Sequence, residues 1–89
     1  MPTQIFQITN IKGLHARASA KFAEVVEDFS ATATVRKDGL EADGDSIMGL
    51  LMLAATVGTS IEVETSGPDA EALMDALAAL VADRFGEGD

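Results

Sequence analysis

The fold is indicated most clearly by residues 61–73, whose sequence is IEVETSGPDAEAL. In the first half, apolar residues and a threonine alternate with glutamates, and this period of two is typical of a half-buried strand. Pro68 follows, and proline is well placed at the start of a helix. The apolar residues after it recur on one helical stripe, at Leu73, Leu77, Leu80 and Val81. We therefore expect a helix over residues 69–85, closed by Gly86.

The segments before this stretch supply three further strands and another long helix. The predicted strands cover residues 3–9, 31–36 and 40–42, and the predicted helix covers residues 16–28. Apolar and polar residues alternate in the strands, whereas Phe22, Val26 and Phe29 recur at helical spacing. Lys37-Asp38-Gly39 supplies a turn between the second and third strands, so these two are expected to form a hairpin.

The segment from Ser46 to Ala55 has almost no polar face, which is unusual for a short surface helix. Asp45 or Ser46 can serve as its N-cap. One side packed against a sheet would use only Leu50, Leu53 and Ala54, so we expect the other apolar residues to stay exposed. With this helix the element order is β-α-β-β-α-β-α, which predicts an α+β fold: one domain over residues 1–89, with a four-stranded antiparallel sheet covered on one face by three helices.

Composition excludes several classes of protein. The formal net charge of −9, with only 6 lysines and arginines, would repel nucleic acid and anionic lipids. The absence of cysteine rules out disulfides and thiolate zinc sites. The N-terminus has no basic segment followed by a long apolar run, so neither secretion nor membrane insertion is expected. We predict a cytoplasmic protein with no nucleic-acid or membrane partner.

The single histidine lies where the first strand leads into the first helix, in KGLHARAS, residues 12–19. A helix start offers unpaired backbone N–H groups and the positive end of the helix dipole, which together favour an anion. A phosphoryl group on the His15 imidazole can be held there by the amides of Ala16, Arg17 and Ala18, with the Arg17 guanidinium balancing its charge. Neutral imidazole is the nucleophile that accepting a phosphoryl group requires.

Spacing alone leaves other interpretations open, because a lone histidine near a helix start often serves as a cap or lies on the surface. If His15 has only such a role, the protein is an interaction module that binds a partner through its apolar helix. A third class, a small α+β domain that binds nucleic acid or a ligand, is disfavoured by the negative charge and the aromatic content of 4%. One histidine lacks the further ligands of a metal site, so we expect neither metal nor cofactor.

Two motifs add a family resemblance. The sequence GLHAR, residues 13–17, followed by alanine and serine, closely resembles the active-site motif of HPr proteins of the phosphoenolpyruvate-dependent phosphotransferase system. The sequence GDSIMGLL, residues 44–51, is similar to the second motif of that family, around its regulatory serine. Length and element order agree over essentially the whole chain, which makes two motifs at this separation a specific signal.

The resemblance implies an open-faced β-sandwich that works as a phosphoryl-transfer intermediate and not as a stand-alone enzyme. Enzyme I, or its nitrogen-branch paralogue, would phosphorylate Nδ1 of His15, and the group would pass to an enzyme IIA-type domain. Arg17 carries over as the phosphate-stabilising residue, and Ser46 as the site of a serine kinase and phosphorylase in some lineages. The partner interface carries over to Ile47, Met48 and Leu51. We expect a monomer.

Two features depart from the family pattern. Ala18 stands where the family usually has proline, so the first helical turn keeps an extra amide donor. Glu24 and Glu27 stand where the family often has lysines that face partners. The acidic balance and the Met-rich segment resemble the nitrogen-related branch of the family as much as the sugar-transport branch, and the sequence leaves that choice open.

Overall fold

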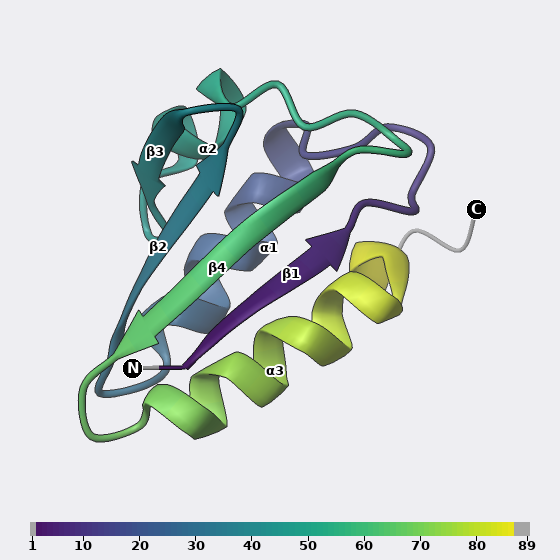
Figure 1. The fold of residues 1–89 in the computed structure, drawn as a ribbon. Coiled ribbons are helices and arrows are strands. Elements are labelled where there is room, and N and C mark those ends of the chain that lie inside the picture. Colours follow the sequence, from purple (N-terminus) through teal and green to yellow (C-terminus); the bar gives the residue numbers. More distant parts are fainter. Residues whose placement is uncertain (1, 87–89) are drawn as a thin grey trace.

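The computed structural model describes residues 2–86, and in them a four-stranded antiparallel sheet carries helices on one face and is open on the other (Figure 1). The elements are β1 (Thr3–Gln7), α1 (Ala16–Glu27), β2 (Thr32–Lys37), β3 (Leu40–Asp43), α2 (Ile47–Met52), β4 (Ser60–Ser66), α3 (Ala70–Ala82) and a 3-10 turn, η1 (Arg84–Gly86). The strand order is β1-β4-β2-β3. This is the α+β open-faced sandwich that the sequence predicts, with the predicted order of elements.

Strand β4 lies inside the sheet, paired with both β1 and β2. Its residues Ile61, Val63 and Thr65 are buried, whereas Glu62 and Glu64 between them are only half-buried. Val63 stands opposite Val35 of β2, which is also fully buried. The predicted period of two is therefore confirmed, because every second residue of β4 has to meet the helices.

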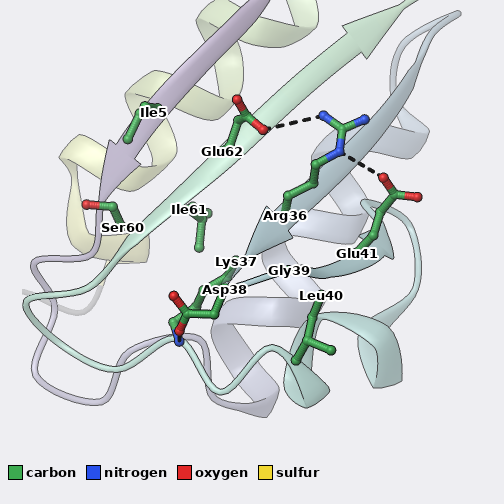
Figure 2. A pocket seen from close by; sticks show the side chains of 10 residues that line it. All are labelled: Ile5, Arg36, Lys37, Asp38, Gly39, Leu40, Glu41, Ser60, Ile61 and Glu62. Atoms are coloured by element: carbon green, nitrogen blue, oxygen red, sulfur yellow. Dashed lines mark hydrogen bonds and ion pairs between the residues drawn. The ribbon is translucent and has the colours of Figure 1, made fainter.

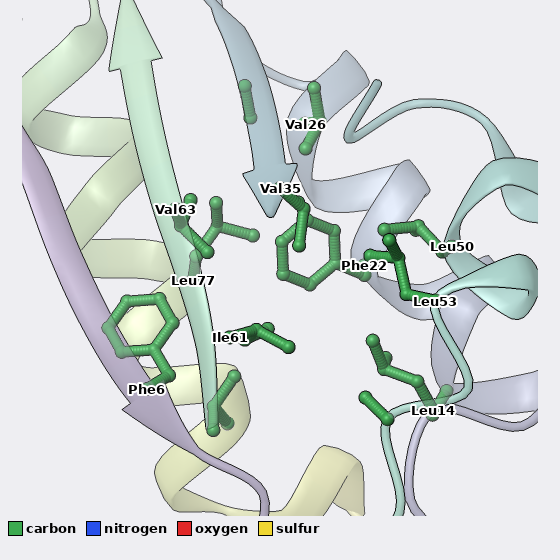
Figure 3. Packing of buried hydrophobic residues seen from close by; sticks show 14 of the residues in the cluster. Phe6, Leu14, Phe22, Val26, Val35, Leu50, Leu53, Ile61, Val63 and Leu77 are labelled. Carbon is green, nitrogen blue, oxygen red and sulfur yellow. The ribbon is translucent and has the colours of Figure 1, made fainter. Parts of the chain in front are cut away.

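The core fills the space between the sheet and the helices. Phe22 of α1 is fully buried and lies near Val35 of β2 and Leu50 of α2 (Figure 3). Leu77 of α3 is fully buried on the side of β4. Burying side chains of this size contributes about 1.5–3 kcal/mol each, so this layer holds α1, the helix that follows His15, against the sheet.

Helix α2 is shorter than predicted. It ends at Met52, with Leu53 as its C-cap, instead of continuing to residue 55. Ala54 then adopts a left-handed conformation with φ of +53°, which turns the chain out of the helix. The prediction that Ala54 faces the core is therefore wrong: Ala54 is exposed, and Ala55 is buried in its place.

Helix α3 also ends early. It stops at Ala82, and Arg84 and Phe85 follow in left-handed conformations with φ of +52° and +55°. Phe85 is fully buried nonetheless, because η1 folds it back onto the core. The sequence also predicts a frayed tail over residues 86–89, and its residues after Gly86 lie outside the described part of the chain. Within residues 2–86 no helix combines the length and the apolar character needed to cross a membrane.

Candidate functional site

His15 occupies the N-cap position of α1, with an extended backbone (φ −77°, ψ −177°). Its Nδ1 accepts a hydrogen bond from the Arg17 N–H at 3.3 Å. Its carbonyl oxygen accepts a bond from the Ser19 N–H at 2.9 Å, the first of the helical pattern. The amides of Ala16, Arg17 and Ala18 therefore lie at the helix start, before that pattern begins. The lone pair of Nδ1 is directed at this positive end of α1.

The loop before His15 is held against the segment that follows α2. The Leu14 N–H donates to the Ala55 carbonyl at 2.9 Å, and the Leu14 side chain is buried. Gly13 has φ of +63°, and a Cβ there would lie only 2.3 Å from the Ala55 oxygen, so glycine is required for the two segments to approach. Asn10 Nδ2 donates to the Gly13 carbonyl at 2.8 Å. These contacts fix where the chain enters α1.

Three of the residues that build this loop were missed by the sequence analysis. Asn10 and Ser19 are fully buried, and Ser19 Oγ donates to the Leu14 carbonyl at 3.3 Å. Two buried polar residues could have been suspected, because Asn10 and Gly13 have the spacing of a turn and Ser19 falls on the apolar side of α1. Ala55 gave no signal, since it acts through a backbone carbonyl contributed from 41 residues beyond Leu14.

Arg17 and its two neighbours lie differently around the helix. Arg17 and Ala16 are exposed, whereas the Ala18 side chain is fully buried in the core. Within residues 2–86 the Arg17 guanidinium makes no ion pair, so its charge is available to an anion bound at the helix start. The residues predicted for the site therefore all lie at the N-cap or in the first turn of α1.

The other predicted residues lie on α2, which packs beside α1. Ser46 is its N-cap, and its hydroxyl accepts a hydrogen bond from the Gly49 N–H at 3.1 Å. Ile47 and Met48 are 41% and 68% exposed, as expected, and Met52 is 73% exposed. Leu51 is partly buried, so its placement on the exposed side was wrong. We call Ile47, Met48 and Met52 the α2 patch.

The open face of the sheet carries a different set of charges (Figure 2). Arg36 forms ion pairs with Glu41 at 2.8 Å, with Glu64 at 2.9 Å and with Glu62 at 3.6 Å, and we call these four residues the Arg36 cluster. The hydrogen bonds that Arg36 donates to Glu41 and, as the second cause, to Glu64 raise the pKa of Arg36 above its usual value.

A hollow of about 400 Å³ lies beside this cluster, lined by residues that include Ile5, Leu40 and Arg36. The other cation of its lining, Lys37, is paired with Asp38 at 2.8 Å. Both cations are thus already neutralised by carboxylates, which makes this hollow a poor site for phosphate. In residues 2–86 no three His, Asp or Glu side chains are grouped to hold a metal ion.

Comparison with known proteins gives one consistent result. Residues 2–83 match the family PTS-HPr, described as PTS HPr component phosphorylation site. The chain is 49% identical to the phosphocarrier protein HPr of Cupriavidus necator over 82 residues, 92% of each chain. It is 41% identical to the phosphocarrier protein NPr of Escherichia coli over 85 residues, 94% of each chain. The crystal structure of HPr-C-His from Thermoanaerobacter tengcongensis superposes with a TM-score of 0.93 at 34% identity, covering 98% of each chain.

Proposed function

Since the chain belongs to the HPr family of phosphocarriers of the phosphotransferase system, we propose that His15 accepts a phosphoryl group from a phosphorylated enzyme I-type protein and passes it to an enzyme IIA-type domain. The observation that carries this proposal is the position of Nδ1 at the start of α1, in contact with the Arg17 N–H. The protein works as a monomeric, cytoplasmic intermediate in this proposal.

The chemistry follows from that position. The Nδ1 lone pair attacks phosphorus as the bond from phosphorus to the donor atom breaks, and the electron pair of that bond stays with the donor. The Arg17 N–H, which bonds Nδ1 before the reaction, is then free to donate to a phosphoryl oxygen. The neighbouring amides and the Arg17 guanidinium stabilise the negative charge that arrives at the helix start. In transfer to the acceptor domain, a nucleophile of that domain attacks phosphorus, the bond from phosphorus to Nδ1 breaks, and its electron pair returns to Nδ1. The site therefore needs to stabilise the phosphoryl group without trapping it.

The experiment is incubation with labelled phosphoenolpyruvate and the host's enzyme I-type proteins, one at a time. Acid-labile, alkali-stable phosphate on His15 supports the proposal, and the protein that delivers it identifies the sugar-transport or the nitrogen-related branch. A second candidate, an interaction module without phosphoryl transfer, is favoured only by the exposed α2 patch. Absence of such phosphate with every donor would leave that candidate standing.

We further propose that Ser46 is a regulatory phosphorylation site in a host that has the serine kinase. A phosphate at this N-cap is compatible with the local helix dipole but adds about two negative charges beside the α2 patch. We expect Ser46→Asp to slow phosphorylation of His15 at limiting donor while the melting temperature stays nearly unchanged. Ser46→Ala should cost about 1 kcal/mol of stability through loss of the bond to the Gly49 N–H, with transfer preserved. Equal transfer rates for wild type and Ser46→Asp would limit Ser46 to its capping role.

A further inference from the structure

Carboxylates on two of the protein's surfaces are not arranged for docking. On the open sheet face, the three glutamates of the Arg36 cluster are all engaged in ion pairs with the same arginine. On α3, Glu71 and Asp75 are exposed and make no ion pair within residues 2–86, but this helix exposes no large apolar side chain. Isolated surface charges of that kind are explained by solubility alone.

The face formed by α1 and α2 combines both features. Glu24 and Glu27 of α1 are exposed, and neither forms an ion pair within the described part of the chain. Asp45, just before α2, is exposed and unpaired within the same residues. The α2 patch adds three exposed apolar side chains on the neighbouring helix. Exposed apolar side chains that gather on one face and are bordered by polar residues are typical of an interaction surface.

The orientation of α1 determines where Glu24 and Glu27 lie relative to α2. Lys21 lies on the flank of α1 that faces η1, because its Nζ donates to the Phe85 carbonyl at 2.6 Å. Ala16, Ala20 and Glu27 fall on the opposite flank by the helical repeat, and α2 packs beside α1 on the other side from α3 (Figure 1). Glu24 lies on the exposed ridge between the two flanks. Glu27 is therefore on the α2 side of α1 and Glu24 on its outer ridge, and both share one face with the start of α1.

Resting on the function proposed above, we propose that this face docks a phosphotransfer partner whose contact surface joins an apolar area to a cluster of lysines or arginines. From the helical rise, Glu24 and Glu27 lie about 13 and 18 Å along α1 from His15. The partner's basic cluster therefore lies at that distance from its own phosphorylated group. Arg17 beside His15 gives the face the opposite charge at its other end, so the charge order along α1 sets the docking orientation.

The test compares two variants with the same change in net charge. Glu24→Lys with Glu27→Lys reverses the proposed contact, and Glu71→Lys with Asp75→Lys makes an equal change on α3. Phosphoryl transfer from the host's phosphorylated enzyme I-type protein is measured at limiting donor over a series of NaCl concentrations. We expect the wild-type kcat/KM to fall with salt. The α1 variant should lose about tenfold or more in kcat/KM at low salt, with kcat unchanged, and the α3 variant should stay close to wild type.

The outcomes separate this inference from the function it rests on. Equal losses in both variants, or none in the α1 variant, would overturn the basic partner while leaving the phosphocarrier intact. Failure of the donor to phosphorylate even the wild-type protein would overturn the phosphocarrier and the docking inference together. Phosphoramidate, a small phosphoryl donor that needs no docking face, should label His15 equally in all three proteins. Unequal labelling would show that the α1 substitutions damage the site itself and would overturn the docking interpretation.

Discussion

The open sheet face and the helix face of this protein handle charge in opposite ways. On the sheet, three glutamates share one arginine, so each of these carboxylates has an ion-pair partner within the chain. On the helix face, the Arg17 guanidinium and the Glu24 and Glu27 carboxylates have no ion-pair partner within residues 2–86. Charged side chains that are already paired within the fold contribute little to binding a partner. Unpaired charged side chains on one face indicate where a partner binds.

The largest expected effect follows from removing the nucleophile. We expect His15→Ala to abolish phosphoryl transfer and to cost about 1 kcal/mol of stability, because the side chain also caps α1. His15→Asn is the matched control, since its amide oxygen restores a cap acceptor without a nucleophile. Labelling with phosphoenolpyruvate and thermal unfolding measure the two effects. Label retained in either variant contradicts the assignment of His15.

Glycine substitutions compare the rigidity of the two regions. A Cβ at Gly13 would clash with the Ala55 oxygen, whereas a Cβ at Gly39, in the β2–β3 turn, meets nothing within 4 Å. Both glycines have positive φ, so each change to alanine carries a backbone cost of about 1–2 kcal/mol. Gly13→Ala should add about 1–3 kcal/mol for the clash and slow transfer by displacing His15. Denaturant unfolding measures the free energy of unfolding of both variants. Equal losses would show that the loop before His15 shifts to accommodate the added Cβ.

The two arginines offer the next comparison. Arg17→Ala should slow phosphoryl transfer roughly tenfold to 150-fold, the equivalent of about 1.5–3 kcal/mol for a charge-assisted contact to phosphate. Arg36→Ala should leave the transfer rate within about twofold, because its charge is held by the sheet glutamates. Quench-flow transfer rates at saturating donor measure both. Similar losses of transfer rate in the two variants would mean that the rate depends on the net charge of the protein and not on contact between Arg17 and the phosphate.

The smallest expected effect concerns two exposed apolar residues with similar exposure, Met48 at 68% on α2 and Ile5 at 71% on β1. Met48→Asp should lower kcat/KM for transfer about fivefold, the loss of about 1 kcal/mol of docking energy. Ile5 lies on the sheet, so Ile5→Asp should leave kcat/KM for transfer unchanged. Melting temperatures serve as the control for both. An equal kinetic effect at Ile5 would place partner contacts on the sheet face as well.

Much of the fold could be predicted because its determinants are local. Alternation through Ile61 and Val63 and helical spacing through Phe22 and Val26 act over a few residues and were read correctly. The predicted ends of α2 and α3 were wrong because Ala54, Arg84 and Phe85 adopt left-handed conformations. Such conformations are usually signalled in a sequence by glycine, and none of these residues is glycine. There, packing of Ala55 and Phe85 in the core overrides local preference.

The candidate site divides in the same way. The position of His15 between strand and helix is visible in the sequence, since it depends on neighbouring residues. The contact of Gly13 and Leu14 with Ala55 joins distant segments, and the bond from Arg17 N–H to Nδ1 depends on a side-chain rotamer. Neither leaves a pattern in the sequence, so both required the structure.

The central claim is that the phosphoryl group resides on Nδ1 of His15, and nitrogen-15 and phosphorus-31 NMR of the phosphorylated protein tests it most directly. With the imidazole labelled, we expect coupling between phosphorus and Nδ1, together with a shift of the Arg17 amide proton as its acceptor changes from nitrogen to a phosphoryl oxygen. Coupling to Nε2 instead, or phosphate found on a residue other than His15, would contradict this account.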